Sequence, residues 1–425
     1  MRVVVIGAGI VGVSTAIWLQ RDGHEVVLID RGEPGDGTSF GNAGVLASCS
    51  IVPVTGPGLL AKAPKMLLDP HQPLFLKWGY LPRLMPWLRR YLSHANAPDT
   101  ERIAKGLAAL VPGSLEEHQA LAEGTGAEGY ITPSDYLFGY RDRAHYEGDG
   151  FAWKIRADHG FTWEVLEGEG VRAYDPLLSQ DIGCVARIGG HGHIKDPGGY
   201  VKTLAAHAQA NGATFVKGEA EGVAVEDGVA VGVRVAGETV RGDKVVVASG
   251  AWSKPLCRAL GIDVPLESER GYHLELWSPS AMPRAPIMIA SGKFVATPME
   301  GRIRLAGIVE FGGLDAAPSR APFALLERSL RAAMPSLTWA DTKEWMGHRP
   351  APSDSLPLIG PVPGAEGVFL GFGHHHIGLT AGPKTGRLLA QLLAGRAPNI
   401  DMAAFAPARF APNSQRARVP AAAGS

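Results

Sequence analysis

The fold is decided by RVVVIGAGIVGVSTAIWLQRDGHEVVLID, which occupies residues 2–30. After Arg2 the stretch opens with an apolar run rich in β-branched residues, which is typical of a strand buried in a parallel sheet. Gly7, Gly9 and Gly12 then form a GxGxxG motif. Such glycines allow a tight turn, a close approach of the backbone to a pyrophosphate, and close packing of a helix on a strand. The helix that follows would turn its free N–H groups and the positive end of its dipole toward the phosphates.

A second strand and an acid complete this pattern. Glu25–Asp30 (EVVLID) predicts the strand, and Asp30 stands at its end, 18 residues after Gly12. A carboxylate in this position accepts hydrogen bonds from ribose hydroxyls and disfavours the 2′-phosphate of NADP. Because all the parts occur in order, we expect a dinucleotide ligand. The alternative is a glycine-rich βαβ corner that binds nothing.

Composition narrows the functional class. With 425 residues the chain is long enough for two or three domains. Its 41 Lys and Arg against 42 Asp and Glu give a formal net charge of -1, which argues against nucleic acid as the main partner. Cys49, Cys184 and Cys257 lack the spacing of a disulfide framework or a zinc site and suit a reducing compartment. The uncharged run at 3–19 lies too close to the N-terminus for a signal peptide, so we expect a soluble, cytoplasmic protein.

The segment Asp36–Cys49 follows the second strand and is small, polar and glycine-rich. We expect it near the end of the sheet where ligands bind. Thr38 and Ser39 could bond phosphate oxygens, and Asn42 and Gly44 could let the backbone approach a ring system.

Residues 86–92 (PWLRRYL) predict an amphipathic helix with Pro86 in its first turn. Its mixture of aromatic, leucine and arginine side chains could contact a membrane surface. Packing against the core, with the arginines in water, is the simpler interpretation.

The rest of the chain is rich in predicted strands. The expected strands lie at 223–225, 229–235, 238–240, 271–276, 293–298, 302–308 and 368–372, and residues 243–253 predict a further buried strand that leads into a glycine-containing turn. A helix is expected at 199–212.

The C-terminal part carries the candidate residues for binding a substrate. Residues 347–360 (GHRPAPSDSLPLIG) predict a rigid proline-rich loop that holds Arg349, and residues 373–380 (GHHHIGLT) predict a polar loop. A helix should begin at Pro383, with Thr380 as its N-cap. Because consecutive histidines on an extended loop point in alternate directions, we expect no metal site there.

Taken in order, these segments resemble the D-amino-acid oxidase/dehydrogenase superfamily of FAD enzymes, and most closely its bacterial D-amino-acid dehydrogenase small-subunit type. The resemblance covers nearly the whole chain. It rests on GAGIVG at 7–12 with the acid at 30, TSFGNAG at 38–44, VVVASGAWS at 245–253, RGYHLEL at 270–276, ATPMEGRIRLAG at 296–307, GHRPAPSDSLPLIG at 347–360 and GHHHIGLTAGPKTGRLLA at 373–390.

The resemblance implies an α/β fold with two parts. A discontinuous Rossmann-like FAD-binding domain would comprise residues 1–60, 190–262 and 340–425. An inserted β-rich α+β substrate domain would comprise residues 61–189 and 263–339.

It also implies roles for individual residues. Arg349 would bind the substrate carboxylate, with help from Tyr272, and His376 is a third catalytic candidate. Tyr272 could equally be a core tyrosine, Arg349 could brace its loop, and Glu310 could face the pocket or pair with an arginine. The residues implied to contact FAD are Gly7, Gly9, Ile10, Val11, Gly12, Asp30, Arg31, Thr38, Ser39, Asn42, Ala43, Gly44, Val45, Leu46, Ala220, Ser249, Gly250, Trp252, His375, Gly378, Leu379 and Thr380.

Three features concern the details of this site. His375 stands where the family usually has glycine, so the local backbone or the shape of the pocket could differ. The lysine that activates oxygen in the sarcosine-oxidase branch has no evident counterpart around Leu305–Gly307. The C-terminal loop contains no cysteine, so FAD should be bound non-covalently.

The activity implied is FAD-dependent oxidative deamination of an amino acid, with a D-amino acid favoured. A hydride would pass from Cα to flavin N5, the imino acid would hydrolyse to a 2-oxo acid, and a quinone or another acceptor would take the electrons, with possible contact to the periphery of the inner membrane. The alternatives are a dehydrogenase or oxidase of secondary amines such as N-methyl or proline-like amino acids, a non-catalytic flavin-bound subunit, and an NAD-dependent dehydrogenase.

Overall fold

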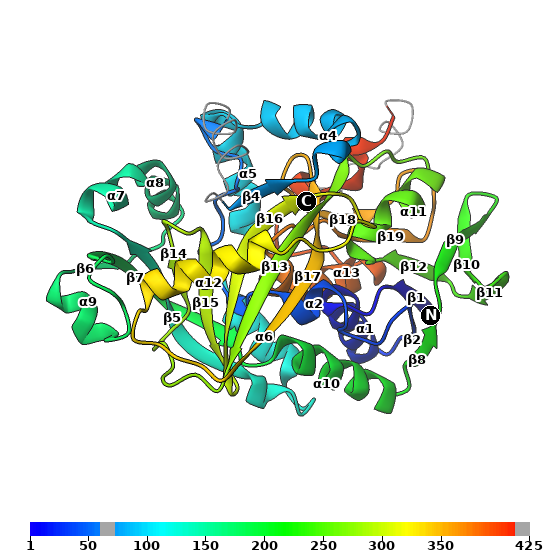
Figure 1. Cartoon of the computed structure of the whole chain (residues 1–425). Coiled ribbons are helices and arrows are strands. Elements are labelled where there is room, and N and C mark those ends of the chain that lie inside the picture. The colour runs from blue at the N-terminus through cyan, green and yellow to red at the C-terminus, as the bar shows by residue number, and fades with distance from the viewer. Residues whose placement is uncertain (60–72, 413–425) are drawn as a thin grey trace.

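The structure is a computed structural model that describes residues 1–59 and 73–412. Two sheets organise it (Figure 1). The first has six strands in the order β18-β19-β12-β1-β2-β8, parallel except for β18. Its strands are β1 (Arg2–Ile6), β2 (Glu25–Asp30), β8 (Thr214–Lys217), β12 (Lys244–Val247), β18 (Leu358–Pro361) and β19 (Val368–Phe372).

Side chains that alternate along β1 bury both faces of this sheet. Val3 and Val5 belong to a core shared with the helices α1 (Ile10–Arg21), α10 (Pro197–Ala210) and α13 (Gly378–Leu393). Val4 and Ile6 belong to a core shared with a three-stranded sheet and α11 (Ser253–Ala259). The strands of that small sheet are β9 (Ala220–Glu226), β10 (Val229–Val235) and β11 (Glu238–Arg241).

The second large sheet is mixed and contains ten strands. Its main path runs β17-β13-β16-β15-β14-β5-β7-β3, with β4 paired to β16 and β6 to β7. Helix α12 (Ala321–Ala333) lies across one of its faces (Figure 1). The strands are β3 (Val45–Leu46), β4 (Leu74–Leu76), β5 (Ile131–Tyr140), β6 (Glu164–Glu167), β7 (Cys184–Ile194), β13 (Leu266–Trp277), β14 (Ile287–Ile289), β15 (Phe294–Met299), β16 (Arg302–Phe311) and β17 (Asp341–Pro352).

The remaining α-helices of the described residues lie between β2 and β7 in the sequence. They are α2 (Thr38–Gly41), α4 (Leu81–Ser93), α5 (Ala97–Leu110), α6 (Ser114–Ala122), α7 (Arg143–Gly148), α8 (Gly150–Asp158) and α9 (Glu169–Tyr174). The predicted α/β class, with a parallel nucleotide-binding sheet beside a larger β-rich sheet, is confirmed. Among the described residues, no helix is long and apolar enough to cross a membrane.

The expected proline-rich loop around Arg349 is wrong, because these residues form the end of β17. β17 is the edge strand of the mixed sheet, where proline is tolerated because one row of N–H groups has no partner strand. The same strand starts at Asp341, inside the range that the sequence assigned to the FAD-binding part, yet it pairs along its length with β13.

Two helix starts also differ from the sequence prediction. Helix α4 begins at Leu81 with Pro82 in its first turn, so Pro86 lies inside the helix. Helix α13 begins at Gly378, so Thr380 lies in its first turn and is not the N-cap. Pro383 lies inside α13 and has no N–H for the Leu379 carbonyl four residues earlier. The His118 ring takes that place, with Nε2 2.9 Å from the Leu379 oxygen.

Candidate active site

One large cavity connects the glycine motif to the mixed sheet. It has a volume of about 1360 Å³ and is lined by Gly7 and Gly9 at one end and by Gly271 and Arg349 at the other. A cavity of this size exceeds the ~300–1,000 Å³ of ordinary ligand sites and suits a dinucleotide together with a substrate.

The three glycines divide their work as the motif predicts. A Cβ on Gly12 would lie 1.8 Å from the Gly7 carbonyl oxygen, so Gly12 serves close packing and does not line the cavity. Gly7 has φ 107° and a Cβ there would lie 2.4 Å from the Ala248 oxygen. Gly9 faces the cavity, where backbone and ligand can approach each other.

The N-termini of two helices, α13 and α1, meet at the cavity. Among the described residues, no partner is found for the N–H groups of Gly378, Leu379 and Thr380 in the first turn of α13, which has no side-chain cap. At the start of α1, the Ile10 N–H donates to Ser39 Oγ at 2.9 Å. Such helix ends favour anions and electron-rich groups.

The Asp30 carboxylate faces the same cavity from the end of β2. It accepts hydrogen bonds from the Ala8 N–H at 2.7 Å and the Gly32 N–H at 3.0 Å. These bonds fix the carboxylate where a ribose would lie. With the glycine motif and the two helix ends, the residues present therefore fit FAD.

The loop between β2 and β3 is held by side chains of the mixed sheet. Arg304 Nη1 donates to the carbonyls of Phe40 and Asn42, both at 2.8 Å, and Thr297 Oγ1 donates to the Ala43 carbonyl at 2.7 Å. The His273 ring lies with Nδ1 2.9 Å from the Gly41 carbonyl. Four successive carbonyls are thus bound by the second sheet, and the first sheet's cofactor loop is fixed to it.

Arg304 was missed by the sequence prediction. Its guanidinium is fully buried and also pairs with Glu275 at 2.6 Å. The signal was available in the sequence, because RIRL at 302–305 places two arginines on one face of a strand whose other face is apolar.

Arg349 extends over β13 because Gly271 has no side chain. A Cβ on Gly271 would lie 2.7 Å from Arg349 Cζ. Within the described part of the chain, the guanidinium has no hydrogen bond or ion pair. Burial lowers the pKa of Arg349, and the negative charge of Glu269 partly opposes this shift. An arginine held in a cavity without a protein partner is poised to bind an anionic ligand.

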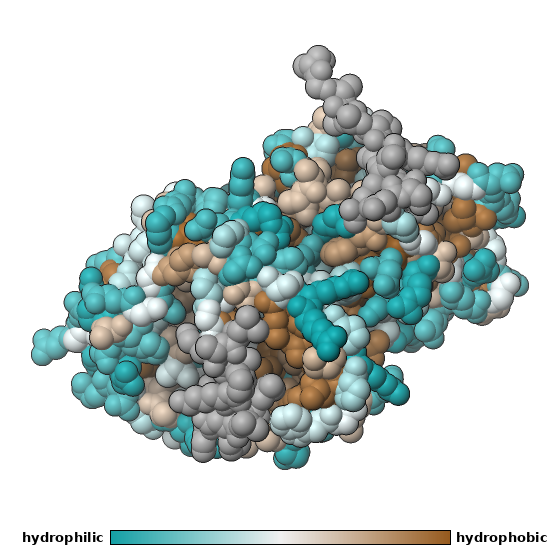
Figure 2. Space-filling model, turned by 90° about the horizontal axis from the view of Figure 1, so that it is seen from above, coloured by the Kyte–Doolittle hydropathy of each residue, from teal (hydrophilic) through white to brown (hydrophobic). Residues whose placement is uncertain are grey.

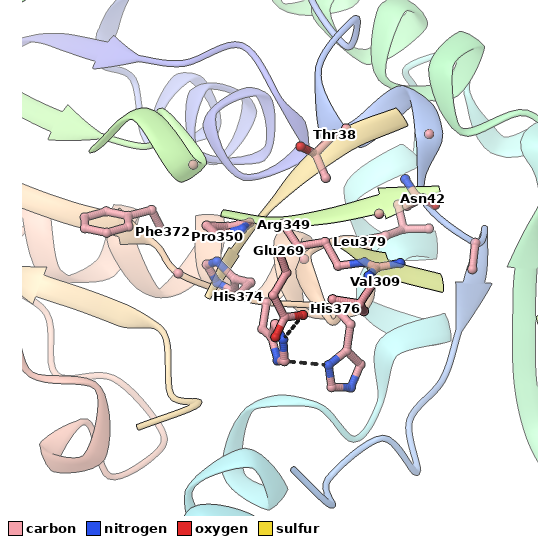
Figure 3. Close-up of a pocket in the computed structure, with 18 of the residues that line it drawn as sticks. Thr38, Asn42, Glu269, Val309, Arg349, Pro350, Phe372, His374, His376 and Leu379 are labelled. Carbon is pink, nitrogen blue, oxygen red and sulfur yellow. Dashed lines mark hydrogen bonds and ion pairs between the residues drawn. The ribbon is translucent and has the colours of Figure 1, made fainter. Parts of the chain in front are cut away.

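A carboxylate and two histidines lie beside Arg349 (Figure 3). Glu269 Oε2 lies 2.6 Å from His375 Nε2, and His375 Nδ1 lies 3.2 Å from His376 Nδ1. Burial alone would raise the pKa of Glu269, but the charge and hydrogen bond of His375, followed by the charge of Arg349, outweigh burial and lower it. Burial, followed by the charge of His375, lowers the pKa of His376 to about 3, so this ring is neutral at neutral pH. His374 is bound instead to Thr385 Oγ1 at 2.9 Å.

Tyr272 is turned away from Arg349, contrary to the expectation that it assists there. Its hydroxyl donates to Glu310 Oε2 at 2.6 Å, and its ring packs against Phe323 of α12 on the other face of the sheet. Glu310 also pairs with Arg270 at 2.9 Å, which is the arginine pairing that the sequence left open.

Tyr91 of α4 is the tyrosine beside Glu269, and the sequence analysis did not single it out. It lines the cavity, and within the described residues its hydroxyl has no hydrogen-bond partner. Burial and the charge of Glu269 raise its pKa. Helix α4 is docked next to Arg349 because the Trp87 Nε1–H donates to the Ala351 carbonyl at 2.9 Å.

Most residues implied by the resemblance meet at this cavity. Gly12 and Leu46 lie behind the cavity wall. Those that line it are Gly7, Gly9, Ile10, Val11, Asp30, Arg31, Thr38, Ser39, Asn42, Ala43, Gly44, Val45, Ala220, Ser249, Gly250, Trp252, Arg349, His375, His376, Gly378, Leu379 and Thr380. The cavity also borders β13 at Tyr272, but the Tyr272 ring and hydroxyl lie on the other face of the sheet.

Comparison with known proteins agrees with this architecture. The family described as DAO, FAD dependent oxidoreductase, matches residues 2–392, and the chain belongs to this family. A D-amino-acid oxidase of Bradyrhizobium diazoefficiens is 38% identical and covers 96% of this chain and 99% of its own. A D-amino acid dehydrogenase of Xanthobacter autotrophicus is 32% identical over 97% of this chain and 99% of its own.

Solved structures share the fold. Glycine oxidase from Geobacillus kaustophilus has a TM-score of 0.73 at 22% identity and covers 95% of this chain and 98% of its own. L-proline dehydrogenase from P. horikoshii has a TM-score of 0.72 at 18% identity, covering 96% and 97%. The predicted class, an FAD-dependent oxidoreductase of the D-amino-acid oxidase/dehydrogenase type, is confirmed.

Proposed function

We propose that the protein oxidises D-amino acids at the α-carbon, giving an imino acid that hydrolyses to a 2-oxo acid and ammonia. FAD, when bound, supplies the hydride acceptor. The observation that carries the proposal is the Arg349 guanidinium, which has no partner among the described residues and lies in the same cavity as the dinucleotide cradle. The names of the relatives at 38% and 32% identity support a D-amino acid as the substrate.

In this proposal, the residues around Arg349 orient the substrate and exclude water. Arg349 grips the carboxylate with its planar fork, which fixes direction as well as distance. Tyr91 offers a hydroxyl to the same carboxylate, and Val309 and Phe311 supply apolar wall next to it. Orientation of this kind can account for a large part of the rate of a reaction that needs little acid–base chemistry.

The N–H groups of Gly378, Leu379 and Thr380 are proposed to stabilise the negative charge of the reduced cofactor. They are oriented by the start of α13, so no reorganisation is needed as the charge develops. His118 and Ser114 bind the carbonyls of Leu379 and Thr380, which holds this turn in place.

We propose that FAD is bound non-covalently. The thiols of Cys49, Cys184 and Cys257 are buried and do not line the cavity. Burial raises the pKa of Cys49 and of Cys184 to about 11, so these thiols are protonated and unreactive. Acid precipitation should release the yellow colour; colour that stays with the precipitate would contradict this proposal.

The electron acceptor is proposed to be a quinone or a similar compound, reached by peripheral contact of a cytoplasmic protein with the inner membrane. Trp78, which lies just before α4, is 58% exposed, and Arg89 and Arg90 are exposed residues of α4. In the view of Figure 2, apolar surface appears between hydrophilic side chains. A dye or quinone should reoxidise the flavin much faster than air. Peroxide formation as fast as dye reduction would favour an oxidase, and Lys293, which lines the cavity beside Gly307, would then be the lysine to replace by Met.

Anaerobic bleaching of the flavin absorbance tests the activity itself. A panel of D-amino acids, their L-enantiomers and secondary amines such as sarcosine and proline should bleach the flavin in that order of preference. Bleaching by secondary amines alone would move the substrate class to N-substituted amino acids. Bound FAD that no amino acid bleaches would indicate a non-catalytic flavoprotein.

A further inference from the structure

Glu269 and Arg349 are directly opposite each other on neighbouring strands, yet they are not paired. Their Cα atoms are register partners in β13 and β17, and both residues line the cavity. Opposite charges in this position ordinarily form an ion pair. Within the described residues, the guanidinium of Arg349 has no such bond, and Glu269 binds His375 instead.

Two features keep these charges apart. Gly271 leaves room for the Arg349 side chain to lie along the sheet, and His375 holds one carboxylate oxygen of Glu269 at 2.6 Å. Figure 3 shows the guanidinium directed away from the Glu269 carboxylate. The other oxygen of Glu269, Oε1, has no hydrogen bond to a described residue. One positive and one negative group are therefore both open to the cavity.

His375 reaches Glu269 from a strained backbone. It has φ 50°, in the left-handed region that favours glycine, and its N–H donates to the Pro350 carbonyl at 2.9 Å. This conformation is strained for a histidine. Glycine would avoid the strain but has no side chain, so it could not contact Glu269.

We propose that Glu269 binds the α-ammonium group of the substrate while Arg349 binds its carboxylate, so that the site receives amino acids as zwitterions. His375 is then a positioning residue that prevents Glu269 from neutralising Arg349. The proposal rests on the proposed function in assigning the substrate carboxylate to Arg349.

The arrangement also provides for the proton that must leave before the Cα–H bond breaks. The ammonium N–H bond breaks and an O–H bond forms on Glu269, which leaves a neutral amine and a neutral carboxylic acid. A low-dielectric site favours this pair over two separated charges. Substrate binding helps further, because its carboxylate offsets the Arg349 charge that lowers the pKa of Glu269.

Binding can be tested without turnover by two unreactive probes of the same shape. 2-Methylalanine is a zwitterion with no Cα–H to lose, and 2-methylpropanoate is the same carboxylate without a charged nitrogen. Their dissociation constants for the FAD-loaded protein can be measured by calorimetry and by the change in flavin absorbance. Wild type should bind 2-methylalanine about tenfold or more tightly than 2-methylpropanoate, as expected for a charge-assisted hydrogen bond.

Glu269→Gln should abolish or reverse this preference. It keeps the shape of the side chain and removes the charge that attracts the ammonium group. Tyr272→Phe is the matched control, because Tyr272 lies on the other face of β13 and should leave the preference unchanged. Equal preferences in wild type and Glu269→Gln, with flavin absorbance intact in both, would overturn the proposal.

His375→Asn tests the positioning role separately. Asparagine tolerates the left-handed backbone but cannot hold Glu269, so Glu269 should pair with Arg349 and both probes should bind about tenfold more weakly. The double variant Glu269→Gln/His375→Asn should regain affinity for 2-methylpropanoate, because Arg349 is free again. Failure of the double variant to regain it would exclude the positioning role.

The pH profile gives a further readout. In Glu269→Gln the substrate must arrive as the free amine, so kcat/KM should rise about tenfold per pH unit until that amine is deprotonated, whereas wild type should level off earlier. Failure of the proposed function would look different. Wild type would then bind 2-methylalanine with the expected preference, but no D-amino acid would bleach the flavin.

Discussion

Each face of β13 borders one arginine, one glutamate and one tyrosine. On one face the glutamate binds the other two residues, and on the other face the three residues leave polar groups open to the cavity. On the α12 face, Glu310 is bound by both of the other residues, with Arg270 Nη1 2.9 Å away in an ion pair and the Tyr272 hydroxyl 2.6 Å away in a hydrogen bond. On the cavity face, Arg349 and Tyr91 have no partner among the described residues, and Glu269 has one oxygen to spare.

The difference teaches how function can be read from buried polar groups. Buried charges are costly unless they are paired and hydrogen-bonded. A closed set of this kind therefore serves stability, whereas an open set indicates a missing ligand. Substitutions on the cavity face should therefore change kcat/KM, and substitutions on the α12 face should change the free energy of unfolding.

The largest effect is expected for Arg349→Ala. Loss of one partner of a desolvated charge pair costs about 3–5 kcal/mol, which is about two to four decades in kcat/KM. Arg349→Lys should lose much of this too, because a point charge cannot copy the planar fork. The flavin spectrum should be unchanged. A kcat/KM within about threefold of wild type would exclude the carboxylate role.

Arg270→Ala should instead destabilise the protein by about 3–5 kcal/mol, because it leaves the buried Glu310 carboxylate without its cation. Urea unfolding followed by fluorescence measures this. The kcat/KM of the remaining folded enzyme should stay near the wild-type value. A stable Arg270→Ala protein that has lost activity would mean that the two faces have been assigned the wrong way round.

Gly271→Ala tests the boundary between the faces. Its Cβ would lie 2.7 Å from Arg349 Cζ, at the flexible end of that side chain, so the guanidinium should move while the sheet remains intact. Misplacement by about 1 Å can cost about a hundredfold in rate, and we expect a loss of about ten- to a hundredfold in kcat/KM with little change in Tm. A large fall in Tm would indicate that the backbone moves instead.

A fall in pH should destabilise the part of the fold that borders the cavity, because it protonates buried histidines that are neutral at pH 7. Burial lowers the pKa of His118 and of His374 to about 4, below the ~6.5 expected in the unfolded chain. Between about pH 6.5 and about pH 4 the unfolded state therefore binds more protons than the folded state, so the free energy of unfolding falls as the pH falls through this range. The loss at pH 5, relative to pH above about 6.5, is about 2 kcal/mol for each histidine. Urea midpoints at pH 7 and pH 5 measure the loss, and His118→Gln should reduce it.

Tyr91→Phe and Tyr272→Phe form the matched pair with the smallest effects. Tyr91→Phe should raise KM by about tenfold and leave stability unchanged, because it removes a hydroxyl that only a ligand can use. Tyr272→Phe should leave kinetics unchanged and lower the free energy of unfolding by about 1–2 kcal/mol, through the lost bond to Glu310. Identical behaviour of the two variants would remove the distinction.

The sequence predicts the dinucleotide cradle because every part of it is local. The strand β1, the glycine turn and helix α1 follow one another within 21 residues, and Gly12 is required by its contact with Gly7 inside that unit. Of the ten strands of the second sheet, the sequence predicted three, β13, β15 and β16, and β13 and β16 extend further than expected. Alternation along a strand is visible in the sequence.

The cavity face of β13 could be predicted only in part, because its composition depends on pairing between segments that are distant in the sequence. Alternation shows that Tyr272 and Glu269 lie on opposite faces of β13, but it cannot show which face borders the cavity. The position of the cavity depends on where β17 and α4 lie. The end of β17 was predicted to be a loop because it contains Pro350 and Pro352. Arg349 was found from its motif, whereas Glu269 and Tyr91 required the pairing.

The edge position of β17 has a consequence for the solubility of the whole molecule. An unpaired sheet edge is a template on which a second chain can add a strand. Here Pro350 and Pro352 have no N–H to offer, and the turn that carries His375 already donates to the Pro350 carbonyl. The segment next to Arg349 is therefore protected from edge-to-edge aggregation partly by Pro350 and His375, which also form part of the wall of the cavity.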